Sequence, residues 1–112
     1  VSSPVFTPLI CVDPILPNVI YSYAFDISED GKIVGLAQEY SNNEYPLLWE
    51  NAQTLHILPT LNTDEYHSGC AMGISNNGEY IAGYSSHLVS DWDRVCIWRR
   101  SSSTYAITDI NN

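Results

Sequence analysis

Positive charge is scarce in this sequence. Lys and Arg together number 4 against 13 Asp and Glu, which gives a formal net charge of −9 over 112 residues. Binding to phosphate backbones needs a basic surface, so this balance argues against DNA or RNA as a partner. It also argues against an anionic membrane surface. No run approaches the roughly 18 apolar residues of a membrane-spanning helix, so the sequence predicts no membrane span.

Cysteine is sparse as well. The spacing of Cys11, Cys70 and Cys96 matches no zinc-binding pattern. Three cysteines allow at most one internal disulfide, and we expect free buried thiols because Cys is often simply buried. The chain starts at Val1 without a charged and apolar leader, so we expect a mature form left after cleavage or a piece of a longer protein.

Motifs of common catalytic and cofactor sites are missing too. The sequence has no G-x-S-x-G nucleophile turn and no glycine loop that would cradle a phosphate. The segment 26–31 (DISEDG) opens like a calcium loop, but Ala37 stands at the twelfth position, where calcium needs a bidentate Glu. We therefore predict no catalytic residue, no metal and no cofactor.

What the sequence does contain is an internal repeat. Four stretches recur in the same order, at offsets of 47 to 49 residues. The matches are AFDISEDGKIVG (24–35) with AMGISNNGEYIAG (71–83), PLLW (46–49) with VCIW (95–98), and LPTLN (58–62) with ITDIN (107–111). The first match contains two of the four stretches and carries one extra residue in its second copy. Residues 24–111 thus form two units.

Each unit is predicted to hold four short strands and almost no helix, because no window has apolar residues at helical spacing. Asp30-Gly31 and Asn77-Gly78 predict tight type I′ hairpins, which need positive φ at both central residues. The first strands end at Ile27 and Ile74. The remaining strands are expected at 32–37, 45–49 and 54–58, and at 79–85, 94–98 and 104–108.

The apolar pattern of these strands predicts how the sheets pack. Stretches such as 47–49 and 95–98 are apolar at consecutive positions, so both faces of each sheet should be covered. Stacked four-stranded sheets with one Trp each are the blade pattern of a β-propeller. We predict an all-β fold of two four-stranded antiparallel propeller-like blades, at 24–62 and 63–112. Residues 1–23 form an N-terminal segment that could supply strands of a preceding blade. The expected structural core of the repeats comprises Ile27, Gly31, Gly35, Trp49, Ile74, Gly78, Gly83 and Trp98.

The repeat resembles a known family. The order Ala-x-x-Ile-Ser-x-x-Gly, then Val/Ala-Gly, an apolar stretch ending in Trp and a Leu/Ile-rich strand, is similar to the HAF-type extracellular repeat of bacterial secreted and surface proteins. The His-Ala-Phe of that family is replaced here at 45–47 and 94–96. The resemblance covers residues 24–111. It implies a propeller-like repeat and an extracellular or cell-envelope location, and it implies no reaction.

Two blades do not close a ring, which needs at least about four. We expect their two outer faces to be bare and to carry Trp and Leu, and large apolar patches on a monomer indicate association. The sequence therefore predicts either a part of a longer propeller or self-association.

The loops that follow the second and fourth strands are long and acidic, and they should leave at one end of the sheets. Long loops on a rigid scaffold are where binding usually occurs. We predict a non-catalytic binding or structural module with a protein or carbohydrate ligand, although acidic loops can also serve solubility alone. Two alternatives stay open: a propeller hydrolase acting on polysaccharide or peptide through loop carboxylates, and a calcium-stabilised adhesin segment. The predicted binding residues are Tyr40, Asp64, Glu65, Tyr66, His67, His87, Asp91, Trp92 and Asp93.

Overall fold

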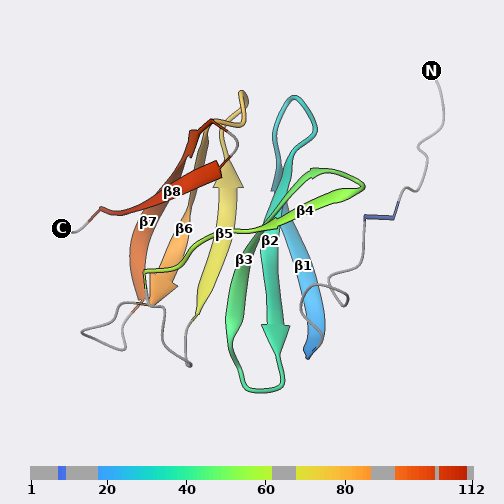
Figure 1. The fold of residues 1–112 in the computed structure, drawn as a ribbon, viewed down its shortest axis with the longest axis vertical. Helices are drawn as coiled ribbons and strands as arrows, with labels where there is room; N and C mark the ends of the chain where they lie inside the picture. The colour runs from blue at the N-terminus through green and yellow to red at the C-terminus, as the bar shows by residue number, and fades with distance from the viewer. Residues whose placement is uncertain (1–7, 10–17, 62–67, 87–92, 103, 111–112) are drawn as a thin grey trace.

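The computed structural model describes residues 8–9, 18–61, 68–86, 93–102 and 104–110. Within them the chain forms eight strands and no helix (Figure 1). The strands join in sequence order into two four-stranded antiparallel sheets, β1-β2-β3-β4 and β5-β6-β7-β8. The predicted all-β class is confirmed at this level. The strands are β1 (Val19–Ile27), β2 (Ile33–Glu39), β3 (Glu44–Asn51), β4 (Thr54–Ile57), β5 (Gly69–Ile74), β6 (Tyr80–Ser86), β7 (Asp93–Ser101) and β8 (Thr104–Asp109).

The first hairpin of each sheet closes differently from the prediction. Ser28 N–H donates to Lys32 C=O at 2.8 Å, and the three-residue loop between them ends in Gly31 with φ of 91°. A type I′ turn needs a positive φ at both central residues. Asp30, which the structure describes, does not have one, so the predicted type I′ turn is wrong. A three-residue loop needs a left-handed residue only at its last position, which Gly supplies without steric cost. The second hairpin holds one more residue, and there Gly78 takes a φ of 74°.

Two strand-interior glycines let neighbouring strands approach closely. A Cβ on Gly35 would lie 1.8 Å from the carbonyl oxygen of Tyr23, and a Cβ on Gly83 would lie 1.9 Å from that of Cys70. Each glycine pairs with an alanine of the adjacent first strand, beside an irregularity in the register. The two sheets therefore share a local backbone arrangement that excludes any side chain at this position.

Each sheet has two unlike faces. Residues paired across strands share a face, and this places three residues around each tryptophan. We call these surfaces the tryptophan faces and the other two the opposite faces. The tryptophan face of β1–β4 carries Ile33, Leu47, Trp49 and Leu55, and that of β5–β8 carries Ile81, Cys96, Trp98 and Ile107.

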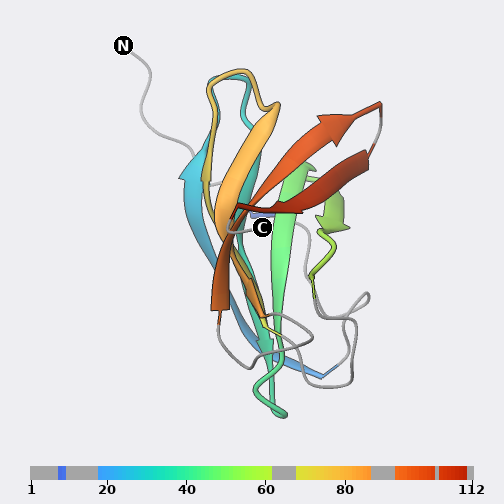
Figure 2. The same cartoon turned by 90° about the vertical axis from the view of Figure 1, so that its left-hand side faces the viewer.

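The main core lies where the tryptophan face of β5–β8 packs on the opposite face of β1–β4. Val34 and Leu48 from the first sheet meet Ile81 and Trp98 from the second, and all four side chains are fully buried. The Trp98 indole N–H donates to Pro59 C=O at 2.7 Å, which satisfies the polar atom of this buried ring. β5 lies against the first sheet, and Figure 1 shows it between β6 and the strands of that sheet. Figure 2 views the molecule from the side of the second sheet, with β7 and β8 in front of β3 and β4.

The outer faces differ from the expectation of bare Trp and Leu. Leu47 and Trp49 are buried on the tryptophan face of β1–β4, where Leu9 and Val19 pack against them. The exposed outer face is the opposite face of β5–β8, where Val95 is 55% exposed. The prediction missed this because apolar periodicity does not tell which faces meet.

Ile27, predicted as part of the repeat core, is 59% exposed. It ends β1, an edge strand whose residues are nearly all exposed, so no neighbouring layer covers it. Its counterpart Ile74 is half-buried and packs against the main core, because β5 lies against the other sheet. β1 also begins at Val19, before the expected unit boundary at residue 24.

Candidate functional site

The described strand ends that flank the predicted binding loops lie at the end of the sheets that is lowest in Figure 1, where β2 ends and β3, β5 and β7 begin. Leu61 N–H donates to Ser85 Oγ at 2.9 Å, and Ser68 N–H donates to Ser86 Oγ at 3.0 Å. These bonds tie together the residues that flank segments 62–67 and 87–92. Seven predicted binding residues lie outside the described residues: Asp64, Glu65, Tyr66, His67, His87, Asp91 and Trp92.

Tyr40 is a predicted binding residue that the structure describes, and it lies in the turn between β2 and β3. The turn is held by hydrogen bonds from Glu39 N–H to Asn43 C=O at 2.9 Å and from Asn42 N–H to Glu39 C=O at 3.0 Å. Asn42 adopts a φ of 70°, a conformation that Asn tolerates better than most residues. The rigid turn leaves the Tyr40 side chain 82% exposed and free to contact a ligand.

The described carboxylates of this end already accept hydrogen bonds from neighbouring side chains. Glu39 accepts one from Tyr45 Oη at 2.9 Å, and Glu44 accepts one from Tyr84 Oη at 3.2 Å. Asp93 accepts one from the Ser68 hydroxyl at 2.9 Å. These carboxylates therefore help to hold the loop bases together.

Burial and the nearby Asp93 charge raise the pKa of Glu44 above its usual value. Burial, with Glu44 close by, also raises the pKa of Cys70 to about 11, and burial next to Asp109 raises that of Cys96 to about 12. Both thiols are free and buried, so they stay protonated at neutral pH. Cys11 lies outside the described residues. Among the residues that are described, no three His, Cys, Asp or Glu side chains are grouped to hold a metal ion.

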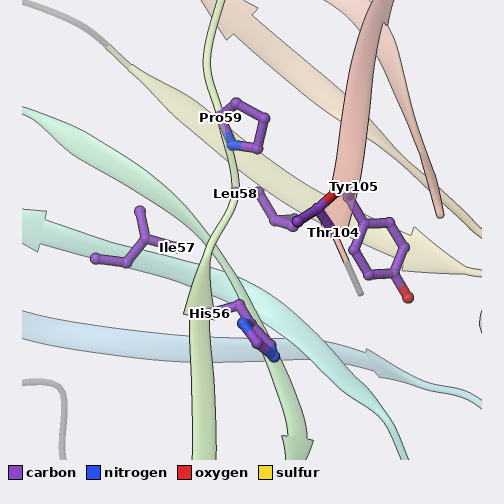
Figure 3. Close-up of a pocket in the computed structure, with 6 residues that line it drawn as sticks. All are labelled: His56, Ile57, Leu58, Pro59, Thr104 and Tyr105. Carbon is purple, nitrogen blue, oxygen red and sulfur yellow. The ribbon is translucent and has the colours of Figure 1, made fainter. Parts of the chain in front are cut away.

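The small cavity in Figure 3 lies between β4 and β8, at the edges of the two sheets. His56, Leu58, Pro59 and Tyr105 contribute to its wall, and its volume is about 210 Å³. Sites for small molecules usually measure about 300–1,000 Å³, so this space is a packing gap between the sheets.

An exposed aromatic row on β1 was missed by the sequence analysis. The ring centroids of Tyr21 and Tyr23 are 5.3 Å apart, and those of Tyr23 and Phe25 are 6.3 Å apart. The three rings are 40, 52 and 47% exposed. Tyr21 Oη donates to Gln38 Oε1 at 2.8 Å, which fixes the row beside the β2–β3 turn. The alternation Tyr-x-Tyr-x-Phe is the signal for this row, but it crosses the predicted boundary between the N-terminal segment 1–23 and the first repeat.

The other end of the sheets, where the short hairpins lie, carries basic residues with local partners. Lys32 pairs with Asp30 within the first hairpin. Arg100 reaches across to Glu50 of the other sheet, with Nη1 to Oε1 at 2.8 Å, and Arg99 lies over the Tyr80 ring at 5.9 Å. This pairing offsets much of the positive charge that the sequence places here.

Within the described residues no helix is long and apolar enough to cross a membrane. No family model, no curated protein and no solved structure matches the chain.

Proposed function

We propose that the chain is a non-catalytic binding and structural repeat module of a secreted or cell-envelope bacterial protein. Its two sheets act as propeller-like blades. The resemblance of residues 24–111 to HAF-type repeats supports the location and the architecture. Two observations support the blade interpretation. Gly35 and Gly83 occupy equivalent positions in the two sheets, and the tryptophan face of one sheet packs on the opposite face of the other.

The observation that carries the binding function is the aromatic row of Tyr21, Tyr23 and Phe25. Exposed rings in line on one strand, tilted against their neighbours by 57° and 34°, offer a continuous apolar surface with hydroxyl groups at its side. Such side chains commonly supply the contact area of binding surfaces. Sugar rings present C–H faces to aromatic rings and hydroxyls to polar neighbours. A carbohydrate chain lying along β1 is therefore the ligand class that the row fits best.

The end of the sheets that carries Glu39, Glu44 and Asp93 extends the surface formed by the aromatic row. Tyr40 lies in the turn that follows Gln38, which holds Tyr21. The loop residues predicted from the sequence would add further aromatic and acidic contacts there. The described carboxylates Glu39, Glu44 and Asp93 accept hydrogen bonds from their neighbours, which supports a structural role for them at the base of this surface.

Affinity electrophoresis in gels that contain one soluble polysaccharide each, neutral, cationic or anionic, tests this function. We expect a neutral or cationic polysaccharide to retard the protein. Tyr23→Ala should weaken retardation about tenfold, since removal of one well-placed aromatic anchor typically costs more than about 1 kcal/mol. Tyr80→Ala is the matched control, because Tyr80 is comparably exposed but lies on the other sheet. Absence of retardation by all polysaccharides, or equal effects of the two variants, would contradict the proposal.

A further inference from the structure

The two sheets can be compared position by position, because Gly35 and Gly83 pair with equivalent alanines. The register then aligns Val34 with Ala82, Pro46 with Val95 and Leu48 with Ile97. These residues belong to the opposite faces. In β1–β4 the three aligned side chains are fully buried, since the tryptophan face of β5–β8 covers them.

In β5–β8 the same positions are open. Val95 is 55% exposed, Ala82 is exposed, and Ile97 is half-buried. A shallow hollow of about 370 Å³ lies on the side of this face that is next to β1. Its lining includes Ala82 and Ile97 of this face and Asp26 of β1. Contiguous exposed apolar surface on a sheet indicates an interface.

The contact inside the chain indicates which surface would cover this face. There a tryptophan face lies on an opposite face, so the interface joins two unlike surfaces. Such a heterologous contact can be repeated, and it closes into a ring or continues as an open assembly. A second copy of the chain offers the required surface on its own β1–β4, where Ile33, Leu47 and Trp49 form the tryptophan face.

That tryptophan face is occupied within one copy by Leu9 and Val19. Val19 belongs to β1, whereas Leu9 lies outside the sheet and is only half-buried. An incoming sheet would therefore have to displace Leu9 but not β1. Competition of this kind weakens association without abolishing it.

We propose that the opposite face of β5–β8 binds the tryptophan face of β1–β4 of a second copy, head to tail, in competition with Leu9. This inference rests on the propeller-like stacking proposed above. Two to four copies would bring together about four to eight sheets, the number found in closed propellers.

Sedimentation equilibrium over a range of protein concentrations tests the proposal. The average mass of the unaltered protein should rise with concentration. Val95→Glu should remain at the monomer mass, because a charge on this face would be buried without a partner. Gln53→Glu is the control, since it adds the same charge in the exposed β3–β4 turn and should associate like the unaltered protein. Leu9→Ser should associate at a concentration at least tenfold lower. Near-UV circular dichroism checks that each variant is folded.

Several results would overturn the proposal. A monomer at every concentration for both the unaltered protein and Leu9→Ser would do so, as would association that Val95→Glu leaves intact. Association that Leu9→Ser does not strengthen would overturn the head-to-tail arrangement and indicate that two opposite faces pair with each other. Polysaccharide retardation of Val95→Glu reports on the aromatic row of β1 alone, so failure of association and failure of ligand binding remain distinguishable.

Discussion

Replacing Gly83 by Ala tests the close approach of β5 and β6. The new Cβ would lie 1.9 Å from the Cys70 carbonyl oxygen, although such contacts are essentially never shorter than 3.0 Å, so the strands must separate by about 1 Å. The oxygen belongs to the backbone and cannot turn away as a flexible side chain could. β5 also lies against the first sheet, so its movement would disturb the main core around Ile81 and Trp98.

Overpacking in a well-packed interior typically costs about 1–3 kcal/mol. For a domain of this size a loss of 1 kcal/mol lowers Tm by about 3–6 °C, so we expect Gly83→Ala to lower Tm by roughly 3–18 °C. Gly35→Ala should behave alike, because the Tyr23 oxygen lies at 1.8 Å from the corresponding Cβ position. Thermal unfolding followed by far-UV circular dichroism measures both.

Gly73→Ala is the matched control in the same sheet. Its Cβ would find Asp26 Oδ2 at 3.7 Å, an ordinary contact, and its φ is not in the left-handed region. The unfolded chain loses conformational freedom with Ala, so Tm should stay or rise slightly. A Gly83→Ala variant as stable as Gly73→Ala would refute the close approach of the strands.

Two further predictions concern the buried core. Trp98→Phe should lower the free energy of unfolding by about 1–3 kcal/mol in urea titrations, because the Pro59 carbonyl loses its donor; an unchanged midpoint would contradict that bond. In a Cys11→Ser background, Cys70 and Cys96 should resist a thiol reagent at pH 8 until the protein is unfolded, and rapid labelling would contradict their burial. Their pKa values are raised from 9.0 to about 11 and about 12, so stability is fully present below pH 9 and falls as pH rises towards 12.

The number, order and ends of the strands were largely readable from the sequence. β1 and β5 end at Ile27 and Ile74 as predicted, and each following hairpin contains the expected glycine. Local signals suffice here, because a strand followed by Asp-Gly or Asn-Gly specifies a turn within a few residues. The exact loop length was not readable, since it depends on how the flanking strands pair.

The arrangement of faces could not be predicted in the same way. Consecutive apolar residues such as Leu47 and Leu48 indicate that both faces of the sheet are buried. In the sequence the two faces are equally apolar, so nothing distinguishes them. Which side meets the other sheet is decided by long-range packing of Trp98 and by Leu9. The candidate site was missed for a related reason. Tyr23 is exposed because β1 lies at the edge of its sheet, which the pattern of β1 alone does not reveal.

The meander topology also has a consequence for how the chain folds. Every strand pairs with its neighbour in sequence, whereas bonds between the sheets, such as Ile74 N–H to Asp26, span about fifty residues. Hairpins form in about 1–10 μs, while ribosomes add only about 5–20 residues per second. The first sheet can therefore assemble on the nascent chain before the second has been synthesised, and it then offers Val34 and Leu48 as a template on which β5 docks.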